Sequence, residues 1–305
     1  MNVAVLANPM VSRWQEAALE NVASLSGVSI ERVVVDASVR AESSQLNAGA
    51  AVINQGRSVS AADLSLFVDV LRDSGLKSLI YADRKLGWTA FGEDATLHHL
   101  QSSDVTAVDC LSDAVHHEVE PVPADGAWNT LPNGVTDTIA DDCSVVIRFG
   151  FGLLKGRILT DPEHGVLSTH GSDIRQYRGM GPKISFVRGD DEVSVTLQRL
   201  TEDIDGGEIV DVSSRELPPH PTLDEVLATV RDLQSESYAA GIEKLRRDDF
   251  EPWEPDELGP YYSHDNQERR VGFVARVLLK NNWHRVRKRL VGREDIDVDA
   301  TPSQG

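Results

Sequence analysis

The chain alternates short valine-rich runs with segments of helical periodicity, and this alternation limits its fold more than any other feature. Residues 2–7 and 28–36 are apolar runs, and the stretch between them opens with Ser12 and Gln15 at capping-box spacing. Strands that alternate with helices favour a parallel sheet covered on both sides. We therefore predict an α/β, Rossmann-like, mostly parallel sheet with helices on both faces, plus a small C-terminal helical appendage.

Further elements follow the same pattern along the chain. Ser60 is expected to cap a helix, a second helix is expected before residue 145, and Thr222 with Glu225 forms another capping box. Strands are expected at residues 79–81, 105–108, 145–147, 166–170, 193–200 and 208–212. We predict an α/β domain over residues 1–225, a helical appendage over 226–293 and a disordered acidic tail over 294–305.

The segment from Arg269 to Arg293 is basic, contains no acidic residue and is interleaved with apolar side chains. One interpretation is an amphipathic helical hairpin that docks on the main domain, and the other is a phosphate-binding or RNA-binding arm. Acidic residues outnumber basic ones by 49 to 30 in the whole chain, which gives a net charge of −19. Such a chain supplies its own complementary surface, so docking is favoured and nucleic acid is not expected as a partner.

Several classes of protein are disfavoured by composition. No apolar run has the roughly 18 residues that a membrane helix needs, and residues 2–7 resemble a strand rather than a signal peptide. The two cysteines form no disulfide framework, and the adjacent histidines at 98–99 and 116–117 lack zinc-site spacing. We expect a cytoplasmic protein with no membrane partner and no metal.

The most informative polar residues lie at the end of one predicted strand. Ser168 and His170 are two positions apart, so they share one face of the strand that begins at residue 166. An Asp205-Gly206-Gly207 turn follows later. A histidine beside an aspartate can donate to a developing oxyanion and move a proton. Histidine and Asp-Gly sequences are common, so this pattern alone does not define an activity.

Together with the Val-Val-Ile-Arg-Phe-Gly run that ends at Gly150 and the Tyr177-Arg178-Gly179 block, these motifs resemble the formyltetrahydrofolate-dependent formyltransferase family. The resemblance extends to the methionyl-tRNA and glycinamide ribonucleotide branches, and it covers roughly residues 75–230. Two departures stand out. The strand-end asparagine of the family is Ser168 here, and Asp173-Ile174-Arg175 replaces a Leu-Leu-Pro sequence.

The resemblance implies formyl transfer from 10-formyltetrahydrofolate to a primary amine of a small molecule, with a nucleotide-linked amino sugar as the acceptor class. It implies catalytic roles for His170, Asp205 and Ser168. It further implies cofactor contacts by Phe149, Gly150, Ser172, Gly206 and Gly207, and substrate contacts by Arg178 and Gly179. Methionyl-tRNA formyltransferase, formyltetrahydrofolate hydrolase and a non-catalytic binding protein stay open as further interpretations. The tRNA branch carries a C-terminal β-barrel domain, which the helical pattern after residue 226 does not match.

Overall fold

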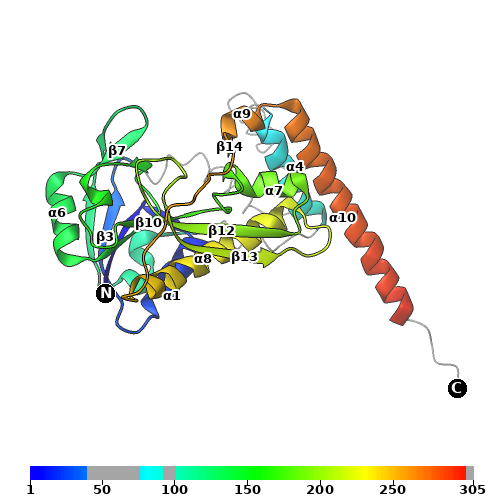
Figure 1. Cartoon of the computed structure of the whole chain (residues 1–305). Coiled ribbons are helices and arrows are strands. Elements are labelled where there is room, and N and C mark those ends of the chain that lie inside the picture. The colour runs from blue at the N-terminus through cyan, green and yellow to red at the C-terminus, as the bar shows by residue number, and fades with distance from the viewer. Residues whose placement is uncertain (40–75, 92–100, 300–305) are drawn as a thin grey trace, which may run out of the picture.

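The computed structural model of the protein describes residues 1–39, 76–91 and 101–299 (Figure 1). Its centre is a seven-stranded sheet with the strand order β13-β12-β10-β8-β1-β3-β5. The strands are β1 Asn2–Ala7, β3 Ser29–Asp36, β5 Val115–Val119, β8 Val145–Arg148, β10 Val166–His170, β12 Glu192–Arg199 and β13 Glu208–Glu216. The five strands from β10 to β5 run parallel, whereas β12 is antiparallel to both of its neighbours.

Successive residues of β1 point to opposite faces of the sheet and belong to two separate cores. Val3 packs in the core that includes helices α1 (Arg13–Ala23) and α8 (Leu223–Leu245). Leu6 packs in the core that includes helix α6 (Asn133–Asp142). The prediction of a mostly parallel sheet with helices on both faces is confirmed.

Shorter elements join these layers. They are β2 Met10–Ser12, α4 Lys77–Phe91, β4 Ser102–Asp104, β6 Val122–Pro123, β7 Trp128–Thr130, β9 Leu153–Leu154, β11 Arg178–Gly179, α7 Gly181–Arg188, β14 Tyr261–Tyr262 and α9 His264–Glu268. The 3-10 helices are η1 Val105–Ala107, η2 Asp109–Leu111 and η3 Arg157–Leu159. Strand β14 pairs with β11, which brings the chain after α8 back toward the loop that follows β10.

Two predicted strands are helical in the structure. The run at 105–108 begins with η1, because the carboxylate of Asp104 caps a helical turn by accepting the backbone N–H of Thr106 at 2.9 Å. The run at 79–81 lies inside α4, where Ile80 is buried. Three or four apolar residues in a row suit a buried strand and a buried helical turn equally well, so the run alone does not decide between them.

Helix α8 packs on the central sheet beside α1, and the domain boundary at residue 225 stays a prediction. The predicted capping box is present, with the backbone N–H of Thr222 donating to Glu225 at 2.7 Å. From this cap the helix runs along the sheet and buries Tyr238 and Ile242 in the core shared with α1. The pattern located the helix, but periodicity does not say which surface a helix covers.

The basic segment forms one continuous helix, α10 (Val271–Asp299), and not a hairpin. Phe273, Val274 and Val277 are buried in a core that α10 shares with α7 and α8. The helix lies at the opposite end of the molecule from α6 (Figure 1). It also passes the tail boundary that was predicted at residue 294, because acidic composition alone does not disfavour a helical backbone.

The helix predicted to begin at Ser60 lies outside the described residues. In the part of the chain that the structure describes, no helix is both long enough and apolar enough to span a membrane.

Candidate active site

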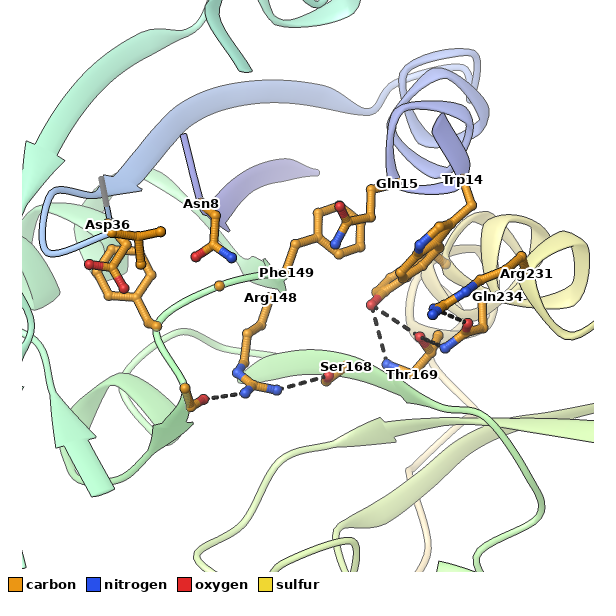
Figure 2. Close-up of a pocket in the computed structure, with 15 residues that line it drawn as sticks. Asn8, Trp14, Gln15, Asp36, Arg148, Phe149, Ser168, Thr169, Arg231 and Gln234 are labelled. Carbon is orange, nitrogen blue, oxygen red and sulfur yellow. Dashed lines mark hydrogen bonds between the residues drawn. The ribbon is translucent and has the colours of Figure 1, made fainter. Parts of the chain in front are cut away.

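Four parallel strands end at one edge of the sheet and surround a cavity of about 480 Å³ (Figure 2). Asn8 follows β1, Asp36 ends β3, Arg148 ends β8 and Ser168 lies near the end of β10. Ligands bind at this edge in open parallel sheets. We call it the strand-end cavity, and it is lined by Asn8, Trp14, Gln15, Asp36, Val39, Arg148, Phe149, Gly150, Phe151, Gly152, Ser168, Thr169, Arg231, Gln234 and Tyr238.

The structure brings His170 and Asp205 together, although neither of them lines the strand-end cavity. Nδ1 of His170 lies 3.4 Å from Oδ1 of Asp205, and only 9% of the histidine side chain is exposed. The other ring nitrogen, Nε2, is buried and has no hydrogen-bond partner among the described residues. Because Asp205 engages Nδ1, Nε2 stays available for a reacting group. Ser168 lies two residues before His170 on the same face of β10, and it lines the cavity.

Asp205 is fixed by its backbone and by its neighbours. It adopts the left-handed region, with φ of 48°, which aspartate tolerates better than most residues. Its Oδ2 accepts the backbone N–H of Gly179 at 3.0 Å. Burial raises the pKa of this carboxyl, but the hydrogen bond and charge of His170 and the Gly179 N–H outweigh burial and hold the pKa below its ordinary value. Asp205 is therefore an anionic partner for His170.

Arg148 contacts Ser168 from the neighbouring strand. One guanidinium nitrogen, Nη1, donates to the Ser168 hydroxyl oxygen at 3.3 Å, and Nη2 donates to the carbonyl of Gly152. The Nε atom is buried without a partner among the described residues, and burial lowers the pKa of this guanidinium. The Ser168 oxygen accepts from Arg148, and its hydroxyl also interacts with Tyr238, so the serine links β8 to the α8 wall of the cavity.

The predicted contact residues Phe149 and Gly150 both line the strand-end cavity. Phe149 packs edge to face on Trp14 and Tyr238, with ring centroids 5.6 and 5.2 Å apart. A Cβ on Gly150 would lie 2.7 Å from the backbone of Ala7, so this close approach of two strand ends requires glycine.

The predicted contacts Ser172, Gly206 and Gly207 do not line the strand-end cavity. Ser172 is only 3% exposed, and its hydroxyl donates to a backbone carbonyl of its own loop at 2.7 Å. The N–H of Gly207 donates to the side chain of Gln198 at 3.0 Å. A Cβ on Gly207 would lie 2.4 Å from the carbonyl oxygen of Arg199. These contacts give Ser172 and Gly207 structural roles in the loops around Asp205.

Arg178 and Gly179, predicted to contact substrate, also hold the loop that carries Asp205. Arg178 donates through Nε to the carbonyl of Gly259 at 2.9 Å and through Nη1 to the carbonyl of Ile204 at 3.4 Å. Gly179 supplies the backbone N–H that Asp205 accepts. In the structure both residues position the aspartate.

Sequence reasoning missed Arg231 and Arg148, which both line the strand-end cavity. The Arg231 guanidinium lies 4.9 Å from the ring centroid of Trp14 and donates to Gln234 at 2.9 Å. Burial, with a smaller contribution from Arg84, lowers the pKa of Arg231 to about 10. Arg148 directly follows the buried run 145–147, and a charged residue at the end of a buried strand could have indicated its place in the site. No sequence pattern indicated that Arg231 lines the cavity.

Residues 133–242 match the family model described as formyl transferase. The matched segment runs from α6 into α8 and includes Ser168, His170, Asp205 and Arg231. The predicted resemblance to the formyltransferase family is thereby confirmed over this segment.

The curated relatives of this chain include methionyl-tRNA formyltransferases. The protein from Rickettsia massiliae is 28% identical over 160 residues, covering 51% of this chain and 49% of that protein. The protein from Rickettsia prowazekii is 30% identical over 172 residues, covering 56% and 53%. The chain thus spans about half the length of the curated relatives that it matches. A solved 4-N formyltransferase from Francisella tularensis is 12% identical, with coverage of 92% and 87% and a TM-score of 0.49.

Proposed function

We propose that this protein transfers a formyl group from 10-formyltetrahydrofolate to a primary amine of a small molecule, with a nucleotide-linked amino sugar as the acceptor class. The observation that carries the proposal is the pair of His170 and Asp205, in which the buried histidine Nε2 has no partner among the described residues and Ser168 lies two residues earlier on β10. Formyl transfer needs a donor for the developing oxyanion and a group that moves the amine proton. This constellation offers both.

The formyl donor, when bound, supplies an activated formyl carbon whose bond to N10 breaks as the amine nitrogen bonds to that carbon. The Asp205 carboxylate accepts a hydrogen bond from the Nδ1–H of His170 and so keeps Nε2 as the free position of the ring. Nε2 takes the proton that the amine loses and delivers it to N10 of the departing folate. Ser168 donates its hydroxyl hydrogen bond to the formyl oxygen, where negative charge develops.

A small acceptor suits the strand-end cavity. Its volume of about 480 Å³ falls in the range of pockets that hold small molecules. Its walls combine aromatic rings with a larger number of polar side chains, which suits a small molecule that carries polar groups.

The test is a formylation assay that follows folate absorbance with a panel of amines, including nucleotide-linked amino sugars and phosphorylated amines. His170→Ala should lower the rate by about 10²–10⁴-fold, because the general acid–base group is lost. The matched control is His164→Ala, since His164 precedes β10 at the other end of the same strand. The control should keep the wild-type rate. Equal rates for all three proteins would refute the assignment of the site.

The methionyl-tRNA formyltransferase relatives favour a second candidate, formylation of a charged tRNA. A protein with a net charge of −19 should bind tRNA poorly in moderate salt. Filter binding at two salt concentrations tests this, and salt-sensitive tRNA binding would favour the second candidate. In the formylation assay, formate release without an amine would indicate a hydrolase, and absence of turnover with every amine would indicate a binding protein.

A further inference from the structure

Two arginines in the strand-end cavity have only uncharged partners. Arg148 donates to the Ser168 hydroxyl and to a backbone carbonyl, and its buried Nε has no acceptor among the described residues. Arg231 donates to the amide oxygen of Gln234 and lies over the ring of Trp14. Figure 2 shows Arg148 near the β8 end of the cavity and Arg231 at its α8 wall.

Carboxylates are abundant in this chain, and the charge of Asp205 acts on Arg148, but neither arginine forms an ion pair with a carboxylate of the described residues. Acidic residues outnumber basic ones by 49 to 30. The carboxylate that lines the cavity, Asp36, accepts the backbone N–H of Ser38 at 2.9 Å. Among the described residues it forms no ion pair with Arg148 or Arg231.

A guanidinium taken out of water without an anion is unfavourable, because its hydration is lost and its charge is not compensated. Its planar set of N–H donors matches the oxygens of phosphate and carboxylate groups. Two such groups around one cavity, one with an unused donor, form a binding site for an anion that the described part of the protein does not itself supply.

We infer that the strand-end cavity binds an anionic group, a phosphate or a carboxylate, through Arg148 and Arg231, and that the amine acceptor carries this group. The second half of this inference rests on the proposed function, whereas the anion site does not. The cavity has room for more than the anion, and the aromatic rings of Trp14, Phe149 and Tyr238 form an apolar wall for the rest of the molecule.

The test is calorimetric titration of the full-length protein with inorganic pyrophosphate, inorganic phosphate and acetate, in an uncharged buffer without folate or amine. The variants are Arg148→Gln, Arg231→Gln and the double variant. Arg148→Lys keeps the positive charge and checks that loss of charge, and not of packing, explains the result. Arg247→Gln is the matched control, because this exposed arginine pairs with Asp249 far from the cavity. Thermal melts confirm that each variant is folded.

We expect saturable anion binding by the wild type and by Arg247→Gln. Each glutamine variant should weaken binding at least about tenfold, because a hydrogen bond to a charged group is lost. Tighter binding of the phosphates points to a phosphorylated acceptor, and tighter binding of acetate points to a carboxylate. Absence of saturable binding in the wild type, or wild-type affinity in either glutamine variant, would overturn the two-arginine site. A protein that binds anions but formylates no amine refutes the proposed function, and with it the statement about the acceptor, but leaves the anion site standing. A protein that formylates an amine but binds no anion refutes only this inference.

Discussion

The contact between α4 and α10 and the strand-end cavity both enclose arginine side chains, but they balance the charge differently. In the contact, Arg285 donates to the carboxylate of Asp83 at 3.0 Å, and the two side chains are 1% and 7% exposed. In the cavity, Arg148 and Arg231 have hydroxyl, carbonyl and amide partners instead.

The difference separates a structural role from a binding role for the same type of residue. A buried charge that is paired at good geometry holds two elements in register, and removing one partner leaves the other uncompensated. A partly buried charge that the protein does not pair leaves its donors for a ligand. The contact therefore attaches α10 to the main domain, and the cavity is prepared for an anion.

The largest effect is expected when the balanced pair is broken. Arg285→Met should lower the free energy of unfolding by about 3–5 kcal/mol, because Asp83 is left buried without its cation. Urea unfolding of the purified protein measures this. Arg247→Met, which removes one partner of an exposed pair, is the control and should show no measurable change. A variant at position 285 that is as stable as the wild type would contradict the comparison.

The same substitution in the cavity should have a much smaller effect. Arg231→Met removes the contact with the Trp14 ring, worth about 0.5–2 kcal/mol, but it also removes the cost of keeping a charge away from water. We expect the free energy of unfolding to change by no more than about 1 kcal/mol in either direction. If Arg231→Met lost as much stability as Arg285→Met, the two regions would not differ in the way described.

The parallel sheet and the strand end with Ser168 and His170 could be predicted because local sequence determines them. Alternating apolar runs and capping boxes report which segments are strands and where helices begin. The same signals failed for residues 79–81 and for the surface that α8 covers. Both depend on packing between segments far apart in the chain, which no local pattern encodes.

Within the candidate site, the pairing of His170 with Asp205 was predictable only through family resemblance, because His170 ends β10 and Asp205 lies in the turn before β13. The contribution of Arg231 was not predictable at all. In the sequence it is one of many charged residues on a helix, and only the fold shows that most carboxylates of the described chain lie away from the cavity. The positioning roles of Arg178 and Gly179 likewise depend on the return of β14 to β11.

The smallest expected effect lies within the cavity, at the neutral partner of Arg148. Ser168→Asn should keep or modestly raise the rate of formyl transfer, because the amide oxygen can accept from Arg148 while the amide N–H donates to the formyl oxygen. The assay is the one used for His170→Ala. A steep loss of rate would show that the cavity is built around the serine hydroxyl.

Ser168→Asp, similar in size to the asparagine variant, would give Arg148 a carboxylate partner, as Asp83 is for Arg285. Its carboxylate would pair with Arg148, which lies 3.3 Å from the present hydroxyl oxygen, so pyrophosphate binding should be lost while the fold is kept. Pyrophosphate titration of the two Ser168 variants side by side checks this. If the aspartate variant loses pyrophosphate binding and the asparagine variant keeps it, the anion binds to a guanidinium that has no carboxylate partner. If both variants bind pyrophosphate as tightly as the wild type, the anion site lies elsewhere.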